Sequence, residues 1–87
     1  MQLSKSEINK EICKALALVV KELKADKRKS ILAYESDLPR SVVHYILNGV
    51  KDPQLTTFWR LALGLNIKPS ELLRMLEEKI DSSFLDL

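Results

Sequence analysis

Apolar side chains in this sequence recur at intervals of three and four residues, and this spacing predicts helices. The longest such run lies between residues 8 and 23 and contains Ile8, Ile12, Ala15, Leu16, Val19, Val20 and Leu23. Because an α-helix has 3.6 residues per turn, the spacing places these side chains on one face. No stretch alternates apolar and polar residues as a half-buried strand does. The sequence therefore predicts an all-α fold whose first helix covers about residues 6–25.

Proline and glycine divide the rest of the chain. The 87 residues include only three Pro and two Gly, so each is informative about a helix boundary. Pro39 and Pro69 suit the first turn of a helix, where no N–H is needed, and Asn48-Gly49 tolerates the left-handed conformation that ends one. We expect further helices at about residues 30–36, 39–47, 54–64 and 69–80, with Ser30 capping the first of these.

The fourth predicted helix has an apolar face on which Trp59 is expected to pack into the core. The face is formed by Leu55, Phe58, Trp59, Ala62 and Leu65. Residues 1–87 are expected to form one domain, because two cores can hardly share this length.

Composition excludes several classes of protein. The longest stretch without charge, residues 41–50, is half of the ~20 residues that span a bilayer, so no membrane partner is expected. One Cys and one His cannot close a four-ligand metal site, so neither metal nor cofactor is expected. His44 has no Ser, Cys or carboxylate at a catalytic spacing, and we do not expect an enzyme. The amino terminus lacks a basic head and an apolar run, so a cytoplasmic protein is expected.

Charge is unevenly distributed. Residues 21–51 contain seven basic and four acidic side chains, whereas residues 71–87 contain two basic and five acidic ones. The first segment can face phosphate, and the second is unsuited to it. The alternative is that both are ordinary solvated helix faces.

The predicted helix at residues 39–47 has two contrasting faces. Val42, Val43, Ile46 and Leu47 fall on one side of a helical wheel, and Arg40, Ser41, His44, Tyr45 and Asn48 fall on the other. The polar side offers hydrogen-bonding groups of mixed type with only one full charge. Arg can donate two bonds to guanine, and a helix fits the roughly 12 Å major groove. The alternative is a plain amphipathic helix.

Residues 30–73 resemble the Cro and phage-repressor (XRE-like) family of helix-turn-helix DNA-binding proteins. Leu32-Ala33, Asp37-Leu38, Val43 and Ile46 match the pattern in which a small residue lets two helices cross closely and apolar residues lock the pair. The other matching segments are residues 39–43, 46–49, 52–57 and 65–73. The resemblance implies a compact, lambda-repressor-like bundle of five helices, with the helix-turn-helix formed by the second and third.

The resemblance also implies roles for individual residues. The third helix of such proteins enters the major groove, and the matching base contacts are Arg40, Ser41, His44 and Tyr45. Positions at the start of the second helix and in the loop after the third contact phosphate, and here they are Lys29, Ser30, Asn48, Gly49 and Lys51.

Three positions depart from the family pattern. Asp37 replaces the usual Gly of the turn and can adopt the left-handed conformation at modest cost. Pro39 stands where a capping Ser or Thr is frequent, so that cap must come from elsewhere. Leu47 replaces a common Glu, which predicts additional core packing.

Residues 70–87 are expected to form a dimerisation helix and tail, because they offer more apolar surface than five short helices bury. The expected interface residues are Leu72, Leu73, Leu76, Ile80, Phe84, Leu85 and Leu87. The alternative is that they complete the core of one chain.

The predicted function is therefore a sequence-specific regulator of transcription that binds a two-fold symmetric operator in double-stranded DNA as a homodimer. Repression is the expected effect, and activation is the alternative. The resemblance implies a bacterial or phage-encoded protein of the cytoplasm, associated with the nucleoid when bound. One alternative is an antitoxin-type or other protein-interaction module with a protein partner. Another is a degenerate domain that no longer has affinity for an operator.

Overall fold

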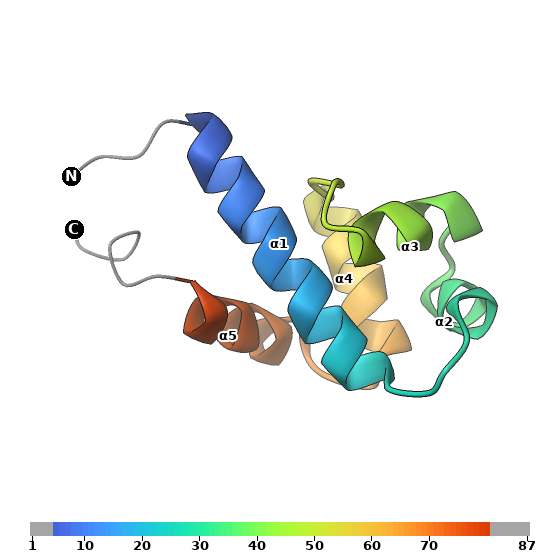
Figure 1. The fold of residues 1–87 in the computed structure, drawn as a ribbon. Helices are drawn as coiled ribbons and strands as arrows, with labels where there is room; N and C mark the ends of the chain where they lie inside the picture. The colour runs from blue at the N-terminus through green and yellow to red at the C-terminus, as the bar shows by residue number, and fades with distance from the viewer. Residues whose placement is uncertain (1–4, 81–87) are drawn as a thin grey trace.

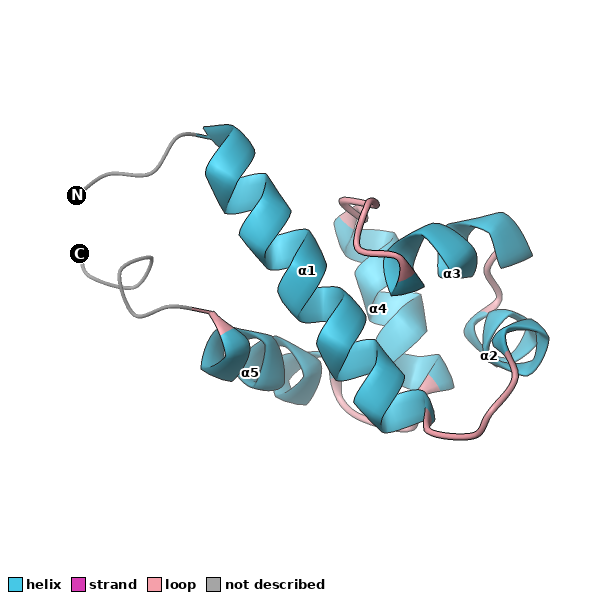
Figure 2. Cartoon of the chain, viewed as in Figure 1, coloured by secondary structure: helices cyan, strands magenta, loops and turns pink. Residues whose placement is uncertain are grey.

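Five α-helices make up the part of the chain that the computed structural model describes, residues 5–80 (Figures 1 and 2). They are α1 (Lys5–Lys24), α2 (Lys29–Ser36), α3 (Arg40–Leu47), α4 (Leu55–Gly64) and α5 (Pro69–Lys79). No strand occurs between residues 5 and 80. The predicted all-α class is confirmed, and each predicted helix is found with ends close to those expected.

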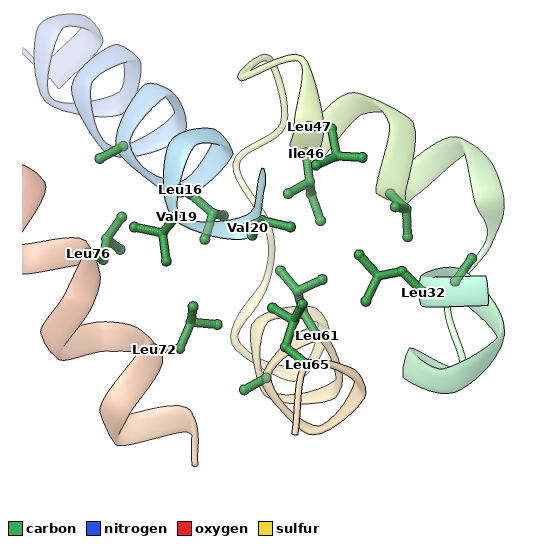
Figure 3. Close-up of a cluster of buried hydrophobic side chains, with 14 residues drawn as sticks. Leu16, Val19, Val20, Leu32, Ile46, Leu47, Leu61, Leu65, Leu72 and Leu76 are labelled. Carbon is green, nitrogen blue, oxygen red and sulfur yellow. The ribbon is translucent and has the colours of Figure 1, made fainter. Parts of the chain in front are cut away.

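All five helices contribute side chains to one apolar core (Figure 3). The α1 residues Leu16, Val19 and Val20 lie at its centre, in agreement with the spacing that predicted the first helix. The other fully buried large side chains come from the remaining helices and are Leu32, Val43, Ile46, Leu61 and Leu72. Because α2 and α3 are only eight residues long, this shared core fixes their relative position.

The start of α2 differs from the prediction. The carbonyl oxygen of Arg28 accepts hydrogen bonds from the N–H groups of Ile31 and Leu32 at 3.1 and 3.0 Å, so Arg28 occupies the N-cap position. Ser30 lies inside the first turn, where its hydroxyl cannot act as the cap. The prediction that Ser30 caps this helix was therefore wrong.

The predicted core position of Trp59 was also wrong. Trp59 is 53% exposed and Leu55 is 74% exposed, whereas Leu61 and Ala62 of the same helix are fully buried. The inward face of α4 is centred on Leu61, Ala62 and Leu65, which pack against α2 and α5. Trp59 and Leu55 lie at the edge of the apolar face of α4, and neither α2 nor α5 covers this edge.

Candidate nucleic-acid interface

A three-residue turn joins α2 to α3 and sets the angle between them. Asp37 adopts the left-handed conformation, with φ 55° and ψ 46°, as expected for the residue that replaces the usual Gly of this turn. The Leu38 N–H donates to the carbonyl oxygen of Ala33 at 2.9 Å, which closes the end of α2. Ala33 is buried, and its small side chain allows the close crossing that a helix-turn-helix requires.

Both helices of this motif begin without a side-chain cap. Pro39 holds the N-cap position of α3, and its carbonyl oxygen accepts from the N–H groups of Val42 and Val43 at 3.1 and 3.3 Å. No side chain of the described residues accepts a hydrogen bond from the first turn of α2 or α3. The N–H groups of the first two residues of each helix, Lys29 and Ser30 in α2 and Arg40 and Ser41 in α3, are therefore left to solvent or a ligand.

The outward face of α3 carries the predicted base-contacting residues. Arg40, Ser41, His44 and Tyr45 are exposed, whereas Val43, Ile46 and Leu47 are buried in the core. The burial of Leu47 confirms the predicted additional packing. The rings of His44 and Tyr45 meet edge to face with centroids 5.6 Å apart, which places two hydrogen-bonding rings side by side on this face.

His44 lies between two predicted phosphate contacts. Nζ of Lys29 lies 3.3 Å from Nδ1 of His44, and Nδ2 of Asn48 lies 3.0 Å from Nε2. A neutral imidazole accepts at one nitrogen and donates at the other. When Lys29 donates to Nδ1, the Nε2–H can donate to the Asn48 amide oxygen after a half-turn of that amide. These side chains thus join the start of α2 to the end of α3.

The loop after α3 lies against α1. Gly49 has φ +73°, and a Cβ built on it would lie 3.7 Å from the Ala17 Cβ, the Cys13 carbonyl oxygen and the Lys14 Cα. The Val50 N–H donates to the carbonyl oxygen of Tyr45 at 3.1 Å, which holds the loop at the end of α3. The predicted phosphate contacts Asn48 and Gly49 are therefore placed beside α3, on the side that faces α1, and Lys51 follows them in the chain with an exposed side chain.

A row of lysines on α1 borders this loop and was missed in the sequence. Lys10, Lys14 and Lys21 line a groove of about 340 Å³ together with Asn48 and Gly49. The spacing of Lys10 and Lys14 is that of neighbours on a helix surface, which was a detectable signal. That these lysines lie beside α3 was not detectable, because their position depends on the contact between the loop and α1.

The predicted dimer-interface residues occupy different environments. Leu72 and Leu76 are buried in the core of the single chain, so they cannot contribute to its outer surface. Leu73 is 50% exposed and Ile80 is partly buried. Phe84, Leu85 and Leu87 lie outside the described residues. Of the described interface residues, Leu73 is the one with a largely exposed side chain.

Cys13 is buried on the core side of α1, and burial together with the nearby negative charge of Asp52 raises the pKa of its thiol. No group of three or more His, Cys, Asp or Glu side chains within residues 5–80 is arranged to hold a metal ion. None of the helices in that range is long and apolar enough to cross a membrane.

The order of the helices and the turn between α2 and α3 define a helix-turn-helix fold of five helices. No protein-family model matches the sequence, and no curated protein matches it. Among solved structures, a mutant of the restriction-modification controller protein C.Esp1396I is similar, with a TM-score of 0.69 and 19% sequence identity. The match covers 86% of this chain and 92% of that one. It confirms the fold that the resemblance implied.

Proposed function

We propose that this chain is a sequence-specific regulator of transcription that binds double-stranded DNA through α3. The observation that carries the proposal is the outward face of α3, where Arg40, Ser41, His44 and Tyr45 are exposed together. Such groups suit the donors and acceptors at base edges, which present a distinct pattern for each base pair in the major groove. The shared fold with a restriction-modification controller protein supports the proposal. We also propose that the chain binds DNA without catalysing a reaction.

Positive charge flanks α3 on two sides, which suits the two phosphate strands that border a major groove. On the α2 side lies Lys29, next to Ser30 and the uncapped first turn of α2. On the other side lie Lys51, Asn48 and Gly49, followed by the α1 lysines. Cations and helix N-terminal amides both bind phosphate oxygens, and such contacts set the register of a protein on the duplex.

The same proposal includes a dimer that represses. One recognition helix contacts only a few base pairs, so useful specificity needs two copies, which a two-fold axis places about 34 Å apart. A dimer bound in this way covers more than one turn of duplex and excludes other proteins from it. Repression is therefore the regulatory effect that we propose.

Selection of bound sequences from a random duplex pool tests the function directly. We expect a two-fold symmetric motif whose half-sites are centred about 10 base pairs apart. A chain that enriches no motif and binds every duplex with equal affinity contradicts the proposal. Titrations at several salt concentrations separate this outcome from a complete absence of DNA binding, because phosphate contacts alone still give a steep salt dependence.

A further inference from the structure

Both ring nitrogens of His44 are used within the chain. The Lys29 Nζ lies 3.3 Å from Nδ1, and the side-chain amide of Asn48 lies 3.0 Å from Nε2. Lys29 is the first residue of α2, and Asn48 directly follows the last residue of α3 (Figure 1). The ring of Tyr45 meets the imidazole edge to face on a further side. One imidazole therefore connects the start of α2 with the end of α3.

The chemistry of these groups fixes the direction of the hydrogen bonds. A lysine ammonium has three donors and no acceptor, so Nδ1 of His44 must accept. The proton of the neutral imidazole then lies on Nε2, which can only donate. The atom of Asn48 that accepts this bond is the amide oxygen, placed there by the half-turn of the amide described above. The hydrogen bonds therefore run in one direction, from Lys29 through His44 to Asn48.

This direction leaves donors at both ends of the hydrogen-bonded chain. The Lys29 ammonium keeps two of its three N–H groups, and the NH₂ group of Asn48 points away from the ring. Phosphate oxygens accept hydrogen bonds from such groups. The free donors thus match phosphate, the contact that the family resemblance implied for both residues. The imidazole, in contrast, keeps no polar atom for a base edge.

The other exposed side chains of the α3 face differ from His44 in this respect. Within residues 5–80, the side chains of Arg40, Ser41 and Tyr45 form no hydrogen bond, so their donors and acceptors are free for base edges. His44 shares their exposure, but its hydrogen-bonding capacity is already used. Exposure alone therefore does not distinguish the residues of this face by role.

We infer that His44 is a positioning residue, which holds Lys29 and Asn48 in place to bind phosphate and does not contact a base. The inference rests on the proposed function and changes the role of one residue in it. Long polar side chains lose rotational freedom when they bind a partner, which weakens the complex. His44 restricts both side chains before DNA is bound, so this loss is smaller on binding. The ring therefore adds affinity that is the same on every DNA sequence.

Nitrogen NMR of the full-length chain without DNA tests the arrangement. His44 is the single histidine, so its ring signals are identified directly. With the imidazole neutral, we expect Nε2 to carry the proton and Nδ1 to accept. Lys29→Ala should move the Nδ1 signal towards that of an imidazole in water, and Asn48→Ala should move the Nε2 signal.

Lys51→Ala is the matched control for this measurement. Lys51 is also an exposed lysine, and in the described structure it makes no hydrogen bond with His44, so its removal should leave both ring signals unchanged. Ring signals that do not respond to Lys29→Ala overturn the inference. So does a proton found on Nδ1, because Lys29 could not then donate to it.

Competition binding tests the role on DNA, with a duplex of random sequence and the duplexes enriched by selection as probes. His44→Ala should weaken binding to all of them alike, by about two- to tenfold, the usual contribution of a hydrogen bond. His44→Gln keeps an acceptor and a donor and should recover most of the affinity. His44 is exposed, so both changes leave the core intact. A changed preference at one base pair in His44→Ala would make His44 a base contact and overturn the inference.

Double variants separate positioning from a direct contact between the ring and phosphate. If His44 acts through Lys29, Lys29→Ala should cost less affinity in the His44→Ala variant than in the unmodified chain, by about twofold or more. Lys51→Ala should cost the same in both. Additive effects for Lys29 as well as Lys51 overturn the inference. A chain that binds no duplex at all contradicts the proposed function instead, and the NMR signals of the protein alone still decide whether the ring holds Lys29 and Asn48.

Discussion

Gly64 of α4 lies directly against Ser36 of α2. A Cβ built on Gly64 would lie 2.9 Å from the Cβ of Ser36 and 3.0 Å from its Cα. Real Cβ atoms essentially never come within 3.0 Å of another heavy atom. The two helices therefore cross at a distance that requires Gly at position 64, and this contact holds the first helix of the helix-turn-helix on the core.

Gly64→Ala should destabilise the protein by about 1–3 kcal/mol, the usual cost of overpacking a close contact. Alanine favours a helix over glycine by about 1 kcal/mol, so only the crossing can make this change unfavourable. Thermal unfolding measures the effect, with Thr56→Ala on the exposed side of α4 as the control. An unchanged or higher melting temperature for Gly64→Ala would contradict the close crossing.

Ser36→Ala should stabilise the protein. The Ser36 hydroxyl is buried and has no hydrogen-bond partner among the described residues, and such a group costs about 1–3 kcal/mol. Removing the oxygen removes this cost and leaves the backbone of α2 unchanged. Urea unfolding should give a higher midpoint for Ser36→Ala than for the unmodified chain. A lower midpoint would mean that the hydroxyl has a partner after all.

The pH dependence of stability should include a contribution from Cys13. Burial raises the pKa of its thiol, so the folded chain keeps the proton at a pH where the unfolded chain, with an ordinary value of about 8.5, has released it. Stability therefore falls as pH rises above about 8.5, by at most about 1.4 kcal/mol per pH unit. Urea midpoints at pH 7 and 9.5 should differ less in Cys13→Ala. Equal pH dependence would place the thiol in water.

Arg40→Ala should relax base preference at one base pair per half-site. A bidentate contact to guanine provides about 1–3 kcal/mol of discrimination, whereas a phosphate contact provides none. Competition binding with operators that differ at single positions measures this. Arg74→Ala removes the same charge from α5, where Arg74 pairs with Glu78, and serves as the control. Equal weakening on all sequences would make Arg40 a phosphate contact.

Lys14→Ala should weaken binding to all duplexes alike. The slope of log affinity against log salt should become shallower by about 0.9 for each phosphate that the variant no longer neutralises. Lys29→Ala and Lys51→Ala should behave in the same way. Lys79→Ala removes an equal charge from α5, where Lys79 pairs with Glu22 at 2.7 Å, and should leave the slope unchanged. If Lys14→Ala also leaves it unchanged, the α1 lysines lie outside the interface.

Local patterns predicted the helices well, because periodicity and the constraints on proline and glycine act within a few residues. The two faces of α3 were predicted for the same reason. The left-handed Asp37 was expected from the family resemblance, because that turn position is usually held by Gly. The sequence did not show which residues at the edge of the apolar face of a helix are exposed. Trp59 and Phe58 are adjacent in sequence, but Phe58 is partly buried beside residues of α1 and α5, whereas Trp59 is 53% exposed.

Contacts between distant segments could not be predicted at all. The approach of Gly49 to Lys14 and the crossing of Gly64 with Ser36 join residues that no periodicity relates. The bond between Lys29 and His44 is of the same kind, since it depends on the angle at the turn. Each of these contacts follows from how α1, α2, α3 and α4 share one core.

The uncapped first turns of α2 and α3 make the stability of this fold depend on what occupies its surface. A helix cap is worth about 1 kcal/mol, and α2 and α3, like α4 and α5, begin without one. A phosphate bound at those amides would supply the missing hydrogen bonds, and any ligand of the folded state at 100 times its Kd adds about 2.7 kcal/mol. By thermodynamic linkage, a melting temperature measured in dilute buffer would then be a lower bound for the protein in the proposed complex with DNA.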